Sequence, residues 1–193
     1  MLCLGDSYTI GEAVEEGDRF PNQAALLLHS KGIYFEKPKI IAQTGWTADE
    51  LTSAIEKENI THTFDFVTLL IGVNDQYRAR STAEYRIRFS ELLKMSVVFA
   101  GGKPKHVIVL SIPDWGATLF AEGRDRKKIA EEIDQFNTIN EDESLKNDVH
   151  YIQITQLTRE HADWLVEDGL HYSGKMYAMW SEQVATIIEK ELK

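Results

Sequence analysis

Residues 64–71 have the sequence FDFVTLLI and are followed directly by Gly72-Val73-Asn74-Asp75. Six of its eight residues are apolar, and the run is short and rich in β-branched side chains. A nearly continuous apolar run is typical of a strand that is buried on both faces of a parallel sheet. We therefore expect a central strand here, with polar side chains in the turn at its carboxyl end.

Four further runs of this kind alternate with helical patterns along the chain. The other predicted strands are Met1–Leu4, Lys39–Ala42, Val107–Ile112 and Val149–Ile154. The predicted helices are Arg19–Lys31, one from Thr47, one from Ser81 to Ala100, one over Arg124–Asn140 and one from Ser173 onward. This alternation predicts an α/β fold with a five-stranded parallel, doubly wound sheet and helices on both faces, which makes three layers.

Length and composition fit one domain over residues 1–193, because the chain of 22.0 kDa contains no linker, repeat or low-complexity segment. The 21 basic and 31 acidic residues give a net charge of −10. Such a charge repels phosphate backbones, so nucleic acid is not an expected partner. The lone Cys3 excludes an intramolecular disulfide and a cysteine zinc cluster.

No apolar stretch approaches the roughly 20 residues that a membrane helix needs, so no integral membrane segment is expected. No signal-peptide pattern is visible either. The sequence as given therefore favours the cytoplasm, and a periplasmic or secreted location applies if an N-terminal segment was removed. The oligomeric state is left open.

Polar or small residues follow each predicted strand, where ligands bind in doubly wound sheets. They are Ser7, Gly45, Asn74, Asp114-Trp115 and the pair Asp168 and His171. All of them are expected on the same edge of the sheet.

Ser7, Asp168 and His171 have the chemistry of a nucleophile with its base. A serine hydroxyl needs a base to remove its proton, and the Asp168-x-x-His171 spacing lets both side chains face the same side. His171 would be the general base and Asp168 would hold its tautomer. Taken alone, however, Gly5-Asp6-Ser7 is more typical of a turn than of a nucleophile, and the Asp/His pair is more typical of a surface loop.

Asn74 supplies an amide that can donate to an oxyanion, together with the backbone N–H groups of Ser7 and Gly45. The alternative interpretations are a tight turn at Gly72–Asp75 and a helix-entry glycine at Gly45. The acids beside these groups, Asp6 and Asp75, are expected to support the loops rather than to react.

These four blocks, in this order, resemble the SGNH (GDSL-type) hydrolase family. Its blocks match Gly5-Asp6-Ser7, Gly45, Gly72–Asp75 and Asp168–His171, so the resemblance spans nearly the whole chain. One departure is Tyr8, which stands where the leucine of the GDSL name would fall.

The resemblance implies a flavodoxin-like sheet, a Ser7–His171–Asp168 triad and an oxyanion hole formed by Ser7, Gly45 and Asn74. It implies a serine hydrolase that cleaves carboxylic esters through an acyl-enzyme, without a metal or organic cofactor. The expected partner is a small-molecule ester or a lipid or sugar ester.

Several alternatives stay open at this stage. Within the family they are a carbohydrate O-deacetylase or a thioesterase, and outside enzymes a non-catalytic module that binds an acyl ligand. No nucleotide-binding glycine loop follows the first strand, and no His-x-x-x-His pair for a metal is present. The candidate substrate-lining residues are Tyr8, Trp46, Tyr77, Trp115 and Leu170.

Overall fold

The computed structural model describes the whole chain, residues 1–193, around one parallel sheet. The strands are β1 (Leu2–Gly5), β2 (Lys39–Ala42), β3 (Val67–Leu70), β4 (Val107–Leu110) and β5 (His150–Ile152). Their order is β2-β1-β3-β4-β5, and every neighbouring pair is parallel. The predicted five-stranded parallel sheet is confirmed.

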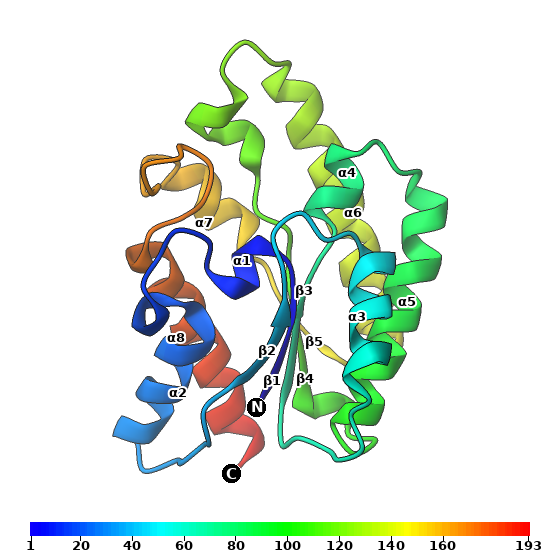
Figure 1. Cartoon of the computed structure of the whole chain (residues 1–193), viewed down its shortest axis with the longest axis vertical. Coiled ribbons are helices and arrows are strands. Elements are labelled where there is room, and N and C mark those ends of the chain that lie inside the picture. The colour runs from blue at the N-terminus through cyan, green and yellow to red at the C-terminus, as the bar shows by residue number, and fades with distance from the viewer.

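Helices cover both faces of the sheet (Figure 1). On one side lie α2 (Phe20–Ser30) and α8 (Gly174–Glu191), and on the other α3 (Ala48–Glu58), α5 (Thr82–Phe99) and α6 (Arg126–Lys146). The shorter helices are α1 (Ser7–Ile10), α4 (Val73–Tyr77) and α7 (Thr155–Glu160). Four 3-10 turns complete the chain: η1 (Glu16–Asp18), η2 (Pro104–His106), η3 (Trp115–Ala117) and η4 (Leu119–Ala121). The three-layer α/β/α arrangement is thus confirmed.

The central strands are buried on both faces, as the apolar run at residues 64–71 predicts. All four residues of β3 are buried, and so are those of β1 beside it. The ladder of β3 is shorter than the predicted run, because Asp65 is exposed and Phe64 only partly buried. The first residues of the run therefore lead into the sheet rather than form part of it.

The predicted helix Arg124–Asn140 is wrong at both ends, because it begins at Arg126 and continues to Lys146. Asp125 is the N-cap, and its side chain accepts from the backbone N–H of Lys128 at 3.0 Å. The sequence pattern did not predict the last turns of α6, because the buried face of these turns is polar. Asn140 and Ser144 are fully buried there, and the hydroxyl of Ser144 donates to the carbonyl of Asn140.

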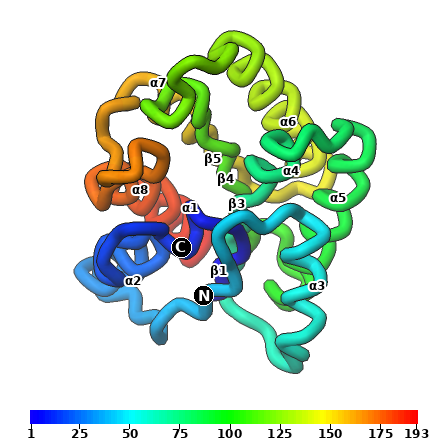
Figure 2. Tube along the Cα trace, turned by 45° about the horizontal axis from the view of Figure 1, so that its top comes forward, coloured from blue at the N-terminus to red at the C-terminus, as the bar shows by residue number.

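The strand order places the switch point of the sheet between β1 and β3, where the chain leaves toward opposite edges. The segments that follow these two strands are α1 and α4, which begin with Ser7 and Val73. Figure 2 turns this edge toward the viewer, and α1 and α4 are seen at the ends of the central strands. The fold therefore brings the first and third motifs to neighbouring positions.

Gly72 joins β3 to α4 with a backbone that a side chain would not fit. Its φ is +125°, and a Cβ there would lie 2.3 Å from the Tyr85 hydroxyl oxygen and 2.8 Å from Cδ1 of Ile112. Tyr85 cannot move aside freely, since it is fully buried and its hydroxyl donates to the carbonyl of Ile71 at 2.9 Å. Glycine is required here by both conformation and space.

We expect Gly72→Ala to lower the free energy of unfolding by about 3 kcal/mol or more, because it combines an unfavourable φ with a collision in the core. Urea unfolding measures the change. Gly17→Ala is the matched control, since no atom lies within 4 Å of its Cβ position, and its effect should stay within about 1 kcal/mol. Equal effects of the two substitutions would contradict this account of Gly72.

Candidate active site

A cavity of about 190 Å³ opens at the carboxyl edge of the sheet. Four of the predicted site residues, Ser7, Gly45, Asn74 and His171, line it together. They come from four segments that are far apart in the sequence. The convergence that the motifs predict is therefore present in the structure.

Ser7 is the first residue of α1, directly after the end of β1. Asp6 caps this short helix, and its Oδ1 accepts from the N–H of Tyr8 at 3.0 Å. The turn is tight, because a Cβ at Gly5 would lie 2.4 Å from the carbonyl oxygen of Leu70. Sequence and packing thus hold Ser7 at the floor of the cavity, where it is 5% exposed.

His171 and Asp168 form a directly hydrogen-bonded pair. The Nδ1 of His171 lies 2.7 Å from Oδ2 of Asp168, while Oδ1 accepts from the backbone N–H groups of Leu170 and His171. Partial burial acts to raise the pKa of Asp168, but these hydrogen bonds outweigh it and hold the pKa below its usual range. An ionised Asp168 favours the tautomer with a proton on Nδ1, which leaves Nε2 as the acceptor.

Asn74 and Gly45 offer unused hydrogen-bond donors at the cavity. The Nδ2 of Asn74 donates to the carbonyl of Trp46 at 3.0 Å, and an amide NH₂ has a second hydrogen to give. Gly45 has a φ of +85° and its carbonyl accepts from Arg78 at 2.6 Å. Its own N–H donates to no backbone or side-chain acceptor.

Two buried acids lie beneath these groups. Oδ2 of Asp75 accepts from the N–H of Ala48 at 3.0 Å, which ties the segment after β3 to the start of α3. Burial raises the pKa of Asp75 to about 6. Burial, together with the nearby charge of Asp75, raises the pKa of Asp6 to about 8 despite the hydrogen bond from Tyr8. Both acids make the supporting contacts expected of them.

Three aromatic rings form one wall of the cavity: Tyr77, Trp115 and Phe120. The ring centroids of Tyr77 and Trp115 are 5.3 Å apart, and those of Trp115 and Phe120 are 6.0 Å apart. The indole N–H of Trp115 donates to the side chain of Gln76 at 2.7 Å. The backbone N–H of Phe120 donates to the carbonyl of Gly169, so the wall is joined to the loop that holds Asp168 and His171.

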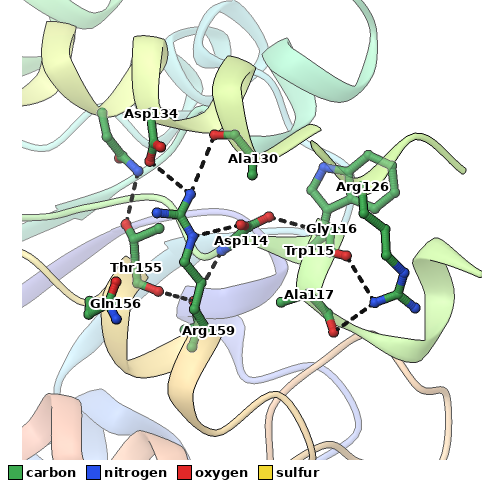
Figure 3. A network of polar contacts seen from close by, with 12 residues as sticks. Asp114, Trp115, Gly116, Ala117, Arg126, Ala130, Asp134, Thr155, Gln156 and Arg159 are labelled. Atoms are coloured by element: carbon green, nitrogen blue, oxygen red, sulfur yellow. Dashed lines mark hydrogen bonds and ion pairs between the residues drawn. The ribbon is translucent and has the colours of Figure 1, made fainter. Parts of the chain in front are cut away.

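A charged network behind this wall fixes the segment that follows β4 (Figure 3). Asp114 is buried, and its Oδ2 accepts from Nε of Arg159 at 2.8 Å. The same guanidinium reaches Asp134 on α6 at 2.8 Å. Oδ1 of Asp114 accepts from the N–H of Gly116, and Arg126 donates to the carbonyl of Gly116 from the other side. Trp115 is therefore held between two anchored neighbours.

The structure places four of the five predicted substrate-lining residues in this cavity: Tyr8, Tyr77, Trp115 and Leu170. Trp46 is not among the lining residues of this cavity; it lines a separate hollow beside α3. Three residues that sequence reasoning missed also line the cavity: Thr44, Val73 and Phe120. Phe120 carries no motif that would single it out, because only tertiary packing brings η4 to the loop at Gly169.

No group of three or more His, Cys, Asp or Glu side chains is arranged to hold a metal ion. None of the helices is long and apolar enough to cross a membrane.

The parallel sheet in this order, with a serine after its first strand and an Asp–His pair before its last helix, is the arrangement of an SGNH-type hydrolase. The family described as GDSL-like lipase/acylhydrolase matches residues 3–179. The chain belongs to this family, as the four sequence blocks predict. A search of curated protein sequences returns no match.

Solved structures share the fold over nearly their whole length. A lipase/acylhydrolase from Enterococcus faecalis has a TM-score of 0.72 at 21% identity, covering 98% of this chain and 95% of its own. Axe2, an acetylxylan esterase from Geobacillus stearothermophilus, has 0.73 at 17% identity, covering 97% and 92%. The psychrotrophic esterase EstA from Pseudoalteromonas sp. has 0.69 at 16% identity, covering 99% and 97%.

The raised pKa of Asp6 has a consequence for stability. Between the ordinary pKa of about 4 and the folded value, the folded chain keeps a proton that the unfolded chain has lost. Stability due to this group is therefore present at low pH and is lost as the pH rises through that range. Asp6→Asn has no such proton to lose and keeps an oxygen that accepts from Tyr8.

Relative to Asp6→Asn, we expect the wild type to lose up to about 1.4 kcal/mol of unfolding free energy per pH unit between about pH 5 and about pH 8. Urea unfolding at several pH values measures the difference. Asp65→Asn removes an exposed carboxylate and is the matched control. Parallel stability curves for the wild type and Asp6→Asn would show that Asp6 is ionised in the fold.

Proposed function

We propose that this member of the GDSL-like family hydrolyses carboxylic esters through an acyl-enzyme formed on Ser7. The observation that carries the proposal is a single cavity lined by Ser7, Gly45, Asn74 and His171, with His171 hydrogen-bonded to Asp168. A nucleophile, an oriented base and an oxyanion site are the parts that acyl transfer needs.

In the first half-reaction, Nε2 of His171 accepts the hydroxyl proton of Ser7 as the serine oxygen attacks the ester carbonyl carbon. Asp168 stabilises the imidazolium that forms. As negative charge develops on the carbonyl oxygen, this oxygen accepts hydrogen bonds from the N–H groups of Ser7 and Gly45 and from the amide of Asn74. These donors are held in place before the reaction, which is why they lower the barrier.

The tetrahedral intermediate then collapses and the bond to the leaving alcohol breaks. His171 gives its proton to the alcohol oxygen, and Ser7 keeps the acyl group as an ester. Water then attacks this ester while His171 takes one of its protons, and the proton returns to Ser7 as the carboxylic acid leaves. The cycle uses only groups of this chain and one water molecule.

The size of the cavity favours a short acyl group. A volume of about 190 Å³ lies below the range of about 300–1,000 Å³ that is typical of pockets for larger ligands, and aromatic and aliphatic side chains supply much of its lining. Two solved structures with the same fold are named as esterases, one of them for acetylxylan. We therefore propose acetyl and other short acyl esters as the substrate class, which a panel of esters of graded acyl length would test directly.

Ser7→Ala should abolish hydrolysis of para-nitrophenyl acetate and labelling by a fluorophosphonate probe, because Ser7 is the one serine that lines the cavity together with His171. Ser53→Ala, on the outer face of α3, is the control and should keep both. Circular dichroism checks that each variant is folded. Labelling of Ser7→Ala at the wild-type rate would remove Ser7 from its role, and an unlabelled wild type would favour a binding module.

Asn74→Ala should lower kcat on the order of a hundredfold, because an oxyanion donor acts mainly on the transition state. Steady-state kinetics with para-nitrophenyl acetate measures the loss. Asn147→Ala removes a comparable amide-to-carbonyl bond, to Glu143 at 2.8 Å, away from the cavity and should keep the wild-type kcat. A loss below about threefold in Asn74→Ala would assign Asn74 to loop structure alone.

A further inference from the structure

The aromatic wall of the cavity carries a positive charge on an otherwise acidic protein. The chain has a net charge of −10, yet four of the five residues in 124–128 are basic. This basic segment begins three residues after the end of the η4 turn, whose Phe120 lines the cavity. The segment therefore follows a part of the cavity wall along the chain, and its charge is positive whereas the net charge of the chain is negative.

Arg124 is the member of this segment that reaches the wall. Its guanidinium carbon lies 5.4 Å from the ring centroid of Tyr77, 5.3 Å from that of Trp115 and 5.2 Å from that of Phe120. One of its nitrogens also donates to the Tyr77 hydroxyl at 3.3 Å. Contacts with three ring faces hold the cation at the wall of the cavity.

The charge of Arg124 is not neutralised by a carboxylate. No acidic side chain lies within 4.0 Å of it, and the neighbouring Asp125 is engaged as the N-cap of α6. Arg159, by contrast, is paired with both Asp114 and Asp134 (Figure 3). Arg124 is exposed and uses one of its five N–H donors, so most of its hydrogen-bonding capacity faces solvent.

Hydrogen bonds hold the segments on which Arg124 packs, both at the η3 turn and at Phe120. Arg126 donates to the carbonyls of Gly116 and Ala117, which fixes the η3 turn (Figure 3). The N–H of Phe120 donates to the carbonyl of Gly169, two residues before His171. The guanidinium is thereby held at a defined position relative to the reacting groups, as a recognition group must be.

We propose that Arg124 is a specificity-determining residue that binds an anionic group, a carboxylate or a phosphate, on the ester substrate. The inference rests on the proposed ester hydrolysis and names a feature of its substrate. A guanidinium that is always charged and forms paired hydrogen bonds is the side chain best suited to such anions. The anion can belong to the acyl group or to the alcohol, since both extend from the same carbonyl.

Two pairs of esters distinguish an anionic group on the acyl side of the substrate from one on the alcohol side. Mono-para-nitrophenyl glutarate and para-nitrophenyl pentanoate have acyl chains of equal length, and only the glutarate carries a charge. On the alcohol side, meta-acetoxybenzoate is compared with its methyl ester. Each pair is assayed with the wild type, Arg124→Gln, Arg124→Lys and Arg88→Gln, an exposed arginine of α5 that is paired with Glu91.

For Arg124→Gln we expect kcat/KM to fall about fivefold to tenfold for the anionic ester of one pair, mainly through KM, and to change less than about twofold for its neutral partner. Arg124→Lys should retain part of the preference, and Arg88→Gln all of it. High ionic strength should reduce the wild-type preference, because the charge is exposed. The pair that responds identifies whether the anion lies on the acyl or the alcohol side.

Three results would overturn the inference. Equal losses on charged and neutral esters would make Arg124 a support of the aromatic wall, and unchanged kinetics on all four esters would remove it from recognition. Both leave the proposed hydrolysis intact, because the neutral esters are still turned over by the wild type. If the wild type turns over none of the esters, the proposed function fails, and the inference fails with it.

Discussion

The parallel pairing of β1 with β3 is the constraint on which the site depends. The register sets Leu2 against Val67 and Gly5 against Leu70, so both strands end at the same level. Ser7 and Asn74 therefore emerge side by side at the switch point of the sheet, where the chain leaves toward opposite edges. Both strands are fully buried, and the site thus rests on the most stable part of the molecule.

Hydrogen bonds between loops turn this placement into a defined geometry. Asp75 accepts from the first N–H of α3, and the amide of Asn74 donates to the carbonyl of Trp46, so the segments after β2 and β3 hold each other. The bond from Phe120 to Gly169 joins the aromatic wall to the loop that holds Asp168 and His171 in the same way. Burial of Asp6 favours its protonated form. We infer that Asp6 serves to hold the turn at Ser7 through its hydrogen bond, and not to supply a negative charge.

Sequence patterns predicted most of this architecture because each depends on local chemistry. The apolar run at 64–71 marks a buried strand, and α3 begins after Thr47 as predicted, with a capping box in which the Glu50 carboxylate accepts from the N–H of Thr47 at 2.9 Å. Prediction failed where the buried residues are polar: α6 continues past Asn140, whose Oδ1 lies 2.8 Å from the hydroxyl oxygen of the buried Tyr85. A polar residue with a buried partner cannot be told from an exposed one by pattern alone.

Apolar runs and short motifs at strand ends were enough to predict the order of strands and helices along the chain, the family, and the residues proposed for chemistry. The residues that surround this site could not be predicted, because they depend on how distant segments pack. Packing places Phe120 in the lining of the cavity and Arg124 over the Phe120 ring, and it leaves Trp46 outside the lining, although Trp46 adjoins a motif and the other two do not. The physical reason is that a wall built from different loops depends on long-range packing and on the Asp114–Arg159 pair, and neither leaves a periodic trace in the sequence.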